Sequence, residues 1–231
     1  MKPAAVSCLL SAALAVTISA CAGQSSPAPA PVSGSVIFPP AAGLAVFTAR
    51  IGGQDRDVAQ ASVTADGAYR LTLPGTLTLT EAAAPDLLSV SVRSTYQTVT
   101  CQGPLTLQPA AARTATISGG RFLIGGSVTA ALQPALQATG LQSPLSPQDA
   151  SIRARQFVYS DRAVTITASQ TCTFRQDDRT VPGTLDVHET LLPGWNILET
   201  SAQVRANTVS VRVSAAGPLT PVDWLYLPRP Y

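Results

Sequence analysis

The chain has 231 residues, and its 15 Lys and Arg residues nearly balance its 13 Asp and Glu residues, which leaves a net charge of +2 at pH 7. This small excess provides no basic surface for nucleic acid and argues against that class of partner. Aromatic residues make up only 5% of the chain, so the hydrophobic cores must consist mainly of Val, Leu, Ile and Ala.

The N-terminal segment has the features of a signal peptide. After Lys2, no charged residue occurs from Ala4 to Ala20, and this apolar run is shorter than the roughly 20 residues that span a bilayer. A short basic start, an apolar stretch and small residues before the cleavage site are typical of secretory signals. We therefore expect residues 1–20 to be a signal peptide.

The end of this segment, Ile18-Ser19-Ala20-Cys21, resembles the lipobox of bacterial lipoproteins. The resemblance implies cleavage after Ala20 and acylation of Cys21, palmitate included, with each CH₂ contributing about 0.8 kcal/mol on burial in the bilayer. It further implies an exported protein held at the cell envelope by the lipid bilayer. Because Ala22 is not the aspartate that retains some lipoproteins at the inner membrane, it implies the outer membrane where two membranes are present. A leader cleaved at another site is the alternative.

Residues 21–32 are small, polar and rich in proline. The sequence after Cys21, "AGQSSPAPAPV", cannot bury apolar area, and its Pro-Ala repeat favours an extended geometry of about 3.1 Å per residue. We expect residues 21–32 to be a lipidated tether that separates the folded part from the bilayer.

From Ser33 onward, short runs of alternating apolar and polar residues are separated by Gly, Pro, Asp and Asn, a pattern typical of all-β proteins. In residues 69–73, Tyr69, Leu71 and Leu73 share one face of a predicted strand, and residues 87–93 alternate in the same way. No comparable helical pattern occurs, since Pro85 limits any helix near it to about one turn.

Part of this region has a recognisable order of motifs. Gly34-x-Val36 opens one strand, Gly43-Leu44-Ala45-Val46 begins the next, and Ala65-Asp66-Gly67-Ala68-Tyr69 turns into Leu71-x-Leu73-Pro74-Gly75. Asp-Gly is a favoured hairpin turn. Residues 34–75 resemble the carboxypeptidase-regulatory-like, transthyretin-type β-sandwich modules of bacterial envelope proteins. The resemblance implies a β-sandwich fold and no catalysis of its own.

Two cysteines remain for the exported chain, because Cys8 lies in the signal peptide and Cys21 carries the lipid. An exported protein meets an oxidising compartment, so we expect Cys101 and Cys172 to form a disulfide that stabilises the fold by roughly 2–5 kcal/mol. A reactive thiol or a metal pair would need a CxxC spacing or nearby histidines, which the sequence lacks.

A second region is expected to begin near Thr114. Its alternating runs include residues 164–169 and 208–214, in which Val164, Ile166 and Ala168, and then Val209, Val211 and Val213, take the apolar positions. We therefore predict an all-β fold of one or two β-sandwich domains, Ig-like or transthyretin-like, with an N-terminal domain at 33–112 and a C-terminal domain at 113–231.

Motifs for catalysis are missing. His188 is the only histidine; no serine has the nucleophile-elbow pattern, and the residues after His188 lack the second histidine of H-E-x-x-H. His188 alternates with Val187 and is expected at the surface. We predict no catalytic residue, no metal site and no cofactor. Carboxylates that could form an unrecognised catalytic pair or a calcium site are Asp161, Asp177, Asp178, Asp186 and Glu189, with Asp55 and Asp57.

The remaining conspicuous side chains have ordinary structural interpretations. Arg153, Arg155 and Arg162 are interpreted as solvated strand ends rather than a ligand patch, and Trp195 and Trp224 as core residues rather than sugar-binding or interface anchors. The sequence thus favours a membrane-anchored, non-enzymatic binding or structural β module with an envelope protein or polysaccharide as partner. A lipid-anchored hydrolase with an unrecognised carboxylate site is the alternative.

Overall fold

The computed structural model describes residues 30–51, 54–80, 84–85, 87–88, 96–140, 150–205, 207–217 and 220–228. All the regular secondary structure in these ranges is β-strand, which confirms the predicted all-β class. None of the ranges contains a helix with the length and apolar character needed to cross a membrane. The predicted signal peptide and residues 21–29 of the predicted tether, Cys21 included, lie outside the described residues. The tether prediction is wrong for residues 30–32, because these residues begin β1 and pair with β4 at Leu73, Thr72 and Leu71.

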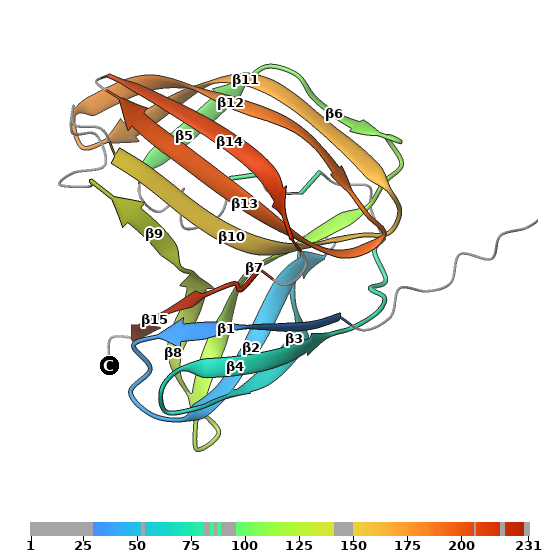
Figure 1. Cartoon of the computed structure of the whole chain (residues 1–231), viewed down its shortest axis with the longest axis vertical. Helices are drawn as coiled ribbons and strands as arrows, with labels where there is room; N and C mark the ends of the chain where they lie inside the picture. Colours follow the sequence, from blue (N-terminus) through green and yellow to red (C-terminus); the bar gives the residue numbers. More distant parts are fainter. Residues whose placement is uncertain are drawn as a thin grey trace, which may run out of the picture.

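The strands of the described residues belong to one continuous sheet (Figure 1). In chain order they are β1 (Ala30–Ile37), β2 (Gly43–Ile51), β3 (Gln54–Val63), β4 (Ala68–Leu73), β5 (Thr98–Gln102), β6 (Leu105–Gln108), β7 (Thr114–Ile124), β8 (Ser127–Pro134), β9 (Leu136–Thr139), β10 (Ala150–Ser160), β11 (Val164–Gln176), β12 (Arg179–Leu191), β13 (Gly194–Arg205), β14 (Thr208–Ala216) and β15 (Trp224–Pro228).

The lower part of Figure 1, called here the first lobe, consists of β1–β4, β7, β8 and β15. Their order β2-β3-β4-β1-β15-β8-β7 closes into a ring because β7 also pairs with β2. The ring encloses a core that includes Phe47, Phe122 and Trp224, all of them fully buried. Since aromatic residues are scarce in the chain, their concentration here shows that this core depends on a few large side chains.

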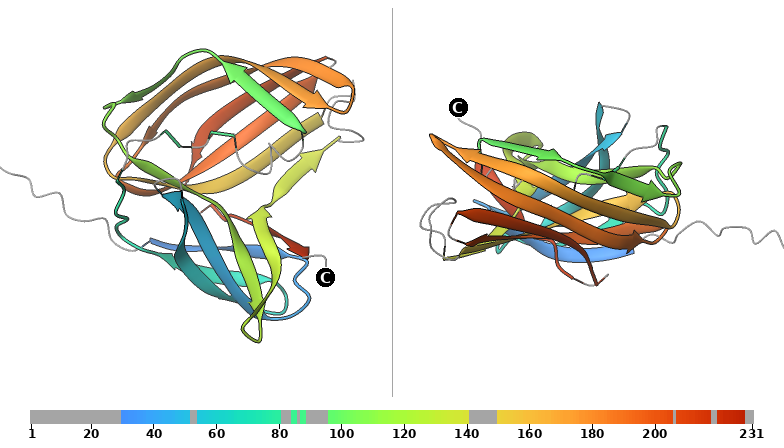
Figure 2. Two further views of the ribbon diagram at one scale, coloured as in Figure 1. Left: turned by 180° about the vertical axis from the view of Figure 1, so that it is seen from behind. Right: turned by 90° about the horizontal axis from the view of Figure 1, so that it is seen from above.

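The upper part of Figure 1, called the second lobe, continues from β7 through β10-β13-β14-β12-β11. β5 and β6 pair with β11, and β9 pairs with β10. Its separate core is mainly aliphatic and includes Ile152, Ile166 and Leu191. Figure 2 shows the two lobes from behind and from above.

The strands β10 and β13 contribute buried side chains to both cores. Along β10, Ile152 and Ala154 face the second core while Arg153 lies on the exposed face, but from Phe157 to Ser160 every residue is buried. Phe157 and Tyr159 pack in the first core. The alternation ends at this point because the first lobe covers the outer face of the strand, so both faces become apolar.

The two cores are not divided at the predicted boundary between residues 112 and 113. β7, β8 and β15 follow this position, yet Phe122, Leu132 and Trp224 share the first core with Phe47. β5 precedes the boundary and pairs with β11 in the second lobe. Each lobe therefore takes strands from both sides of the predicted boundary.

Several local predictions are confirmed. The apolar residues of β4, Tyr69, Leu71 and Leu73, are buried and Arg70 and Thr72 are exposed. The same alternation holds in β11 and β14. The Asp66-Gly67 turn is present: Gly67 has a φ of +90°, which suits glycine, and its N–H donates to the carbonyl of Thr64 at 2.9 Å. Most of the predicted strand 87–93 lies outside the described residues.

Candidate functional site

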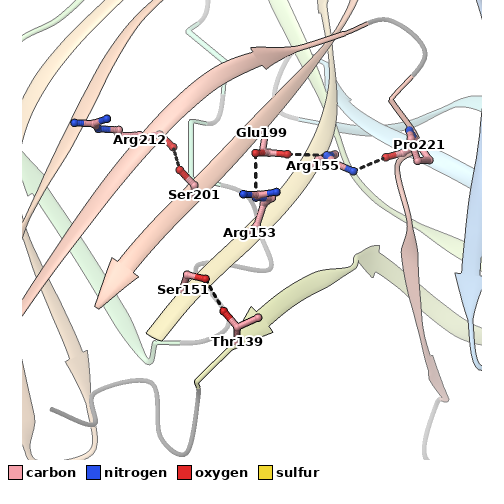
Figure 3. Close-up of polar contacts among 8 residues, drawn as sticks. All are labelled: Thr139, Ser151, Arg153, Arg155, Glu199, Ser201, Arg212 and Pro221. Atoms are coloured by element: carbon pink, nitrogen blue, oxygen red, sulfur yellow. Dashed lines mark hydrogen bonds and ion pairs between the residues drawn. The ribbon is translucent and has the colours of Figure 1, made fainter. Parts of the chain in front are cut away.

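A group of charged residues lies on the outer face of β10 and β13, beside the first lobe (Figure 3). Nε of Arg155 donates to Oε2 of Glu199 at 2.8 Å, and Nε of Arg153 is 3.1 Å from Oε1 of the same carboxylate. The two arginines share a face because they are two residues apart in a strand, and the register places Glu199 opposite Arg155. Both oxygens of one carboxylate are thus paired with a guanidinium.

The segment that leads into β15 covers this group on one side. Nη1 of Arg155 donates to the carbonyl of Pro221 at 3.4 Å, and Asp223 accepts the N–H of Ser35 at 2.9 Å. The carbonyl of Asp223 also accepts the N–H of Ala135 at 2.7 Å. The bond from Arg155 joins β10 to the segment before β15, and the two bonds to Asp223 attach that segment to β1 and to Ala135, directly after β8.

The hollow beside these arginines is small. Gln137, Arg153, Arg155, Pro221 and Asp223 contribute to its lining, and its volume is about 10 Å³. That volume admits about one water molecule, so an organic ligand could only lie over it. The geometry is that of a charged joint between the lobes rather than of a substrate pocket.

The interpretation of the arginines as solvated strand ends is wrong for Arg155. Its side chain is 21% exposed and Glu199 is 18% exposed, whereas Arg153 is 54% exposed. Sequence reasoning missed Glu199 because the pattern of one strand does not show which strand pairs with it. The spacing Arg-x-Arg was the only available signal, since it places two like charges on one face.

Arg162 belongs to a different pair. Its guanidinium donates to both carboxylate oxygens of Asp161, at 3.0 and 2.9 Å, and the Arg113 N–H donates to the same group at 3.0 Å. Burial alone would raise the pKa of Asp161, but these donors outweigh it and hold the pKa below its ordinary value. This carboxylate is therefore ionised, and its oxygens are already hydrogen-bonded to Arg162 and to the Arg113 N–H.

The predicted disulfide between Cys101 and Cys172 is present. The two residues face each other in the register of β5 and β11, and Cys172 is buried in the second core. The bond therefore attaches β5, which lies at the end of the sheet order, to the second lobe.

An apolar hollow of about 450 Å³ lies beside the disulfide. Its lining includes Leu87, Leu88, Leu105 and Leu185, with Gln170 as the polar side chain. Of the described residues that line it, none is an acid, a base or a free nucleophile, so they offer no group for proton transfer or covalent catalysis.

The other carboxylates named from the sequence are dispersed. Asp177 accepts a bond from Gln97, Asp186 from Ser169, and Asp57 pairs with Arg121. Among the residues that the structure describes, no three His, Cys, Asp or Glu side chains gather in an arrangement that could hold a metal ion. Asp177, Asp186 and Asp57 each contact a different neighbouring side chain, on different strands or turns.

His188 and the tryptophans lie largely where the sequence indicated. His188 is exposed on β12, with Nδ1 at 3.5 Å from the Thr167 hydroxyl. Trp224 is fully buried in the first core. Trp195 is half-buried, packs against the same core and donates from Nε1 to the carbonyl of Pro74 at 2.7 Å. Neither indole forms an exposed stacking platform.

Comparison with protein-family models, with curated proteins and with solved structures gives no match for this chain.

Proposed function

We propose that the chain is an exported lipoprotein of the cell envelope, anchored through acylated Cys21, whose β-rich body is a non-enzymatic binding or structural module. The observation that carries this proposal is the disulfide between Cys101 and Cys172, because disulfides form and persist in oxidising compartments outside the cytosol. The lipobox-like sequence Ile18-Ser19-Ala20-Cys21 supplies the anchor. Its partners are the bilayer and an envelope protein or polysaccharide, and in cells with two membranes its place is the outer one.

We also infer a sandwich-like packing for the lobes, with residues 34–75 as a transthyretin-type module in the first. In support, the walls of the closed ring approach one another: the ring of Phe47 on β2 lies 5.7 Å from that of Tyr69 on β4 and 5.0 Å from that of Trp224 on β15. A ring flattened in this way brings two layers of strands together, as in a sandwich.

The anchor is tested by the variant Cys21→Ser, with Cys8→Ser as the matched control. Cys21→Ser removes the acylated thiol, so it should move the protein from the membrane fraction to the soluble exported fraction and abolish incorporation of labelled palmitate. Cys8→Ser changes a residue of the expected leader and should leave both unchanged. Retention of Cys21→Ser in the membrane fraction would refute the anchor.

A further inference from the structure

Three connections of the second lobe meet at one end of its sheet. The connection between β10 and β11 lies beside the one between β12 and β13, because β10 pairs with β13 and β11 pairs with β12 up to these ends. The connection between β6 and β7 adjoins them, since β6 also pairs with β11 and the Asp161 N–H donates to the carbonyl of Arg113 at 3.0 Å. The exposed apolar residues of these connections, called here the rim, are Pro109, Ala110, Ala111, Ala163, Leu192 and Pro193.

Asn196 fixes the turn that carries the largest side chain of the rim. Its carboxamide accepts the N–H of Leu192 at 3.0 Å and donates to the carbonyl of the same residue at 2.9 Å. A further bond runs from this carboxamide to the carbonyl of Gly194 at 3.1 Å. The side chain of Leu192 is nevertheless 67% exposed. Because the backbone of the turn is already fixed, this leucine can be covered with little further loss of conformational freedom.

The charged side chains of the same connections have partners within the protein. Arg162 donates to both carboxylate oxygens of Asp161, and Nη1 of Arg113 donates to the carbonyl of Leu79 at 2.7 Å. An exposed apolar surface next to charges that are already paired suits the interface of a lipid bilayer. There, apolar side chains enter the boundary between head groups and acyl chains, and charged groups stay at the level of the head groups.

The described chain begins at this same end of the molecule. Ala30, the first residue of β1, is opposite Leu73 at the end of β4, and the carbonyl of Pro74 accepts the indole N–H of Trp195, near the start of β13, at 2.7 Å. The start of β1 and the turn between β12 and β13 lie on the same side of the molecule in Figures 1 and 2. Nine Cα–Cα steps separate Cys21 from Ala30, which gives a reach of at most about 30 Å.

Phe38 lies at the opposite end of β1 and is 81% exposed. β1 has eight residues, so it is about 23 Å long. If the Phe38 end faced the bilayer with β1 upright, Ala30 would lie at least this far from the surface, and the chain to Cys21 would be nearly fully extended. If the rim faces the bilayer, Ala30 lies on the near side and the same chain need not be extended. The length of this chain therefore favours the rim.

We propose that the rim rests on the lipid bilayer to which Cys21 is anchored, with Leu192 in the boundary between head groups and acyl chains. The inference deepens the anchor proposed above and rests on it. The acyl chains hold the protein at the membrane, and the rim sets its orientation, with the Phe38 end directed away from the bilayer. Since the anchor keeps the rim near the surface at a high effective concentration, a small apolar contact is sufficient.

The variant Leu192→Trp tests this orientation, with Phe38→Trp as the matched control. Each substitution places an indole at an exposed apolar position, and the two native tryptophans are common to both variants. The acylated protein is reconstituted into vesicles of phosphatidylethanolamine and phosphatidylglycerol whose acyl chains are brominated near the head groups. Bromine quenches the fluorescence of an indole that enters this region, and flotation of the vesicles shows whether the protein is bound.

The added indole of Leu192→Trp should be quenched at least about twofold and its emission should shift to the blue, because apolar side chains at such an interface lie about 5–10 Å into the bilayer boundary. Phe38→Trp should be quenched little and should emit as an indole in water. Ala110→Asp adds a charge to the rim and should reduce the quenching of Leu192→Trp. Ala42→Asp, at an exposed position of the Phe38 end, should leave it unchanged.

If Leu192→Trp does not fold, as judged by circular dichroism, hydrogen exchange of the chain without a rim substitution decides the question. The amides of Ala110 and Ala163 should exchange more slowly in the acylated protein on vesicles than in the Cys21→Ser protein in solution. The amide of Ala42 should exchange alike in the two.

Absence of quenching in folded Leu192→Trp, or quenching no greater than that of Phe38→Trp, would overturn the proposal. In place of these results, equal exchange of the Ala110 and Ala163 amides in the two proteins would do the same. If the protein floats with the vesicles in these cases, the anchor stands and the orientation alone is wrong. Protein that neither floats with the vesicles nor incorporates labelled palmitate would refute the anchor, and this inference with it.

Discussion

The indole of Trp224 and the hydroxyl of Tyr69 are hydrogen-bonded inside the first core. Nε1 of Trp224 donates to the hydroxyl at 3.1 Å, and the hydroxyl donates to the carbonyl of Val222. Burial raises the pKa of Tyr69 above its ordinary value, which keeps the hydroxyl protonated as a donor. The pair joins β4 to β15, two strands from opposite ends of the chain.

Tyr69→Phe should therefore destabilise the protein. The substitution leaves the indole N–H of Trp224 and the carbonyl of Val222 buried without this partner, at a cost of about 1–3 kcal/mol. Urea unfolding followed by tryptophan fluorescence measures the loss. Tyr226→Phe is the control: Tyr226 is half-buried and stacks edge-on against Phe122 at 5.4 Å, and its substitution should change the free energy of unfolding little. Equal effects of the two variants would contradict the assigned bond.

The charged joint between the lobes provides a second prediction. Glu199→Gln removes the counter-charge of Arg153 and Arg155. Arg153 is exposed, but Arg155 and Glu199 are partly buried, so we expect a loss of about 1–3 kcal/mol in the free energy of unfolding. The comparison is Asp57→Asn, which breaks an ion pair with Arg121 whose side chains are 50% and 42% exposed; its loss should stay below about 1 kcal/mol. Chemical denaturation of both variants at one salt concentration makes the measurement. A larger loss for Asp57→Asn than for Glu199→Gln would show that the joint is not stabilising.

Sequence patterns predicted the strands that have one buried face, and failed where a strand has two. β4 and β14 alternate strictly, so their apolar residues could be assigned to a core from spacing alone. In β10 the segment from Phe157 to Ser160 is continuously buried, because the first lobe covers it. This segment does not alternate because both of its faces are buried, and an alternating pattern identifies only strands with one buried face.

Partners across the sheet could not be predicted in the same way. Cys101 and Cys172 were paired by elimination, since only two cysteines remained, and the structure confirms the pair. No elimination of this kind was possible for Arg155, because the sequence contains many acidic residues that could be its partner. Glu199 is the partner because the register of β10 with β13 places it opposite Arg155. The order of strands in the sheet differs from their order in the chain, and that order decides which charges meet.

The disulfide gives the third prediction. Replacing Cys101 and Cys172 together by alanine should lower the free energy of unfolding by roughly 2–5 kcal/mol, measured by urea denaturation. Reduction of the wild-type chain should bring it close to the double variant, and reduction of the double variant should have no effect. Non-reducing peptide mapping should find the two cysteines linked; free thiols at both positions in the exported protein would contradict the assignment.

Tyr96 should make stability depend on pH in the alkaline range. Burial in the second core raises its pKa from about 10 to about 12, and its ring packs edge-on against Phe174 at 5.0 Å. A pKa that is higher in the folded than in the unfolded state favours folding below pH 10, and this contribution is lost as the pH rises toward 12.

The comparison of wild type with Tyr96→Phe isolates this effect. The wild type should lose more of its free energy of unfolding between pH 9 and pH 12 than the variant, which has no phenol at this position. Urea titrations across that range make the measurement, and absorbance at 295 nm follows phenolate formation. Parallel curves for the two proteins would show that Tyr96 titrates alike in the folded and unfolded states.

The interleaving of the two cores predicts that the chain cannot be divided at residue 112. A fragment of residues 113–231 contains Phe122 and Trp224 but lacks β1–β4, which enclose them, so large aromatic surfaces would be exposed to water. It also lacks Cys101, the partner of Cys172. We expect this fragment to aggregate or to unfold without cooperativity, whereas residues 30–231 should show a cooperative thermal transition. A soluble 113–231 fragment with a sharp transition would show instead that the second lobe folds without the first, because the surfaces buried between them would then be dispensable.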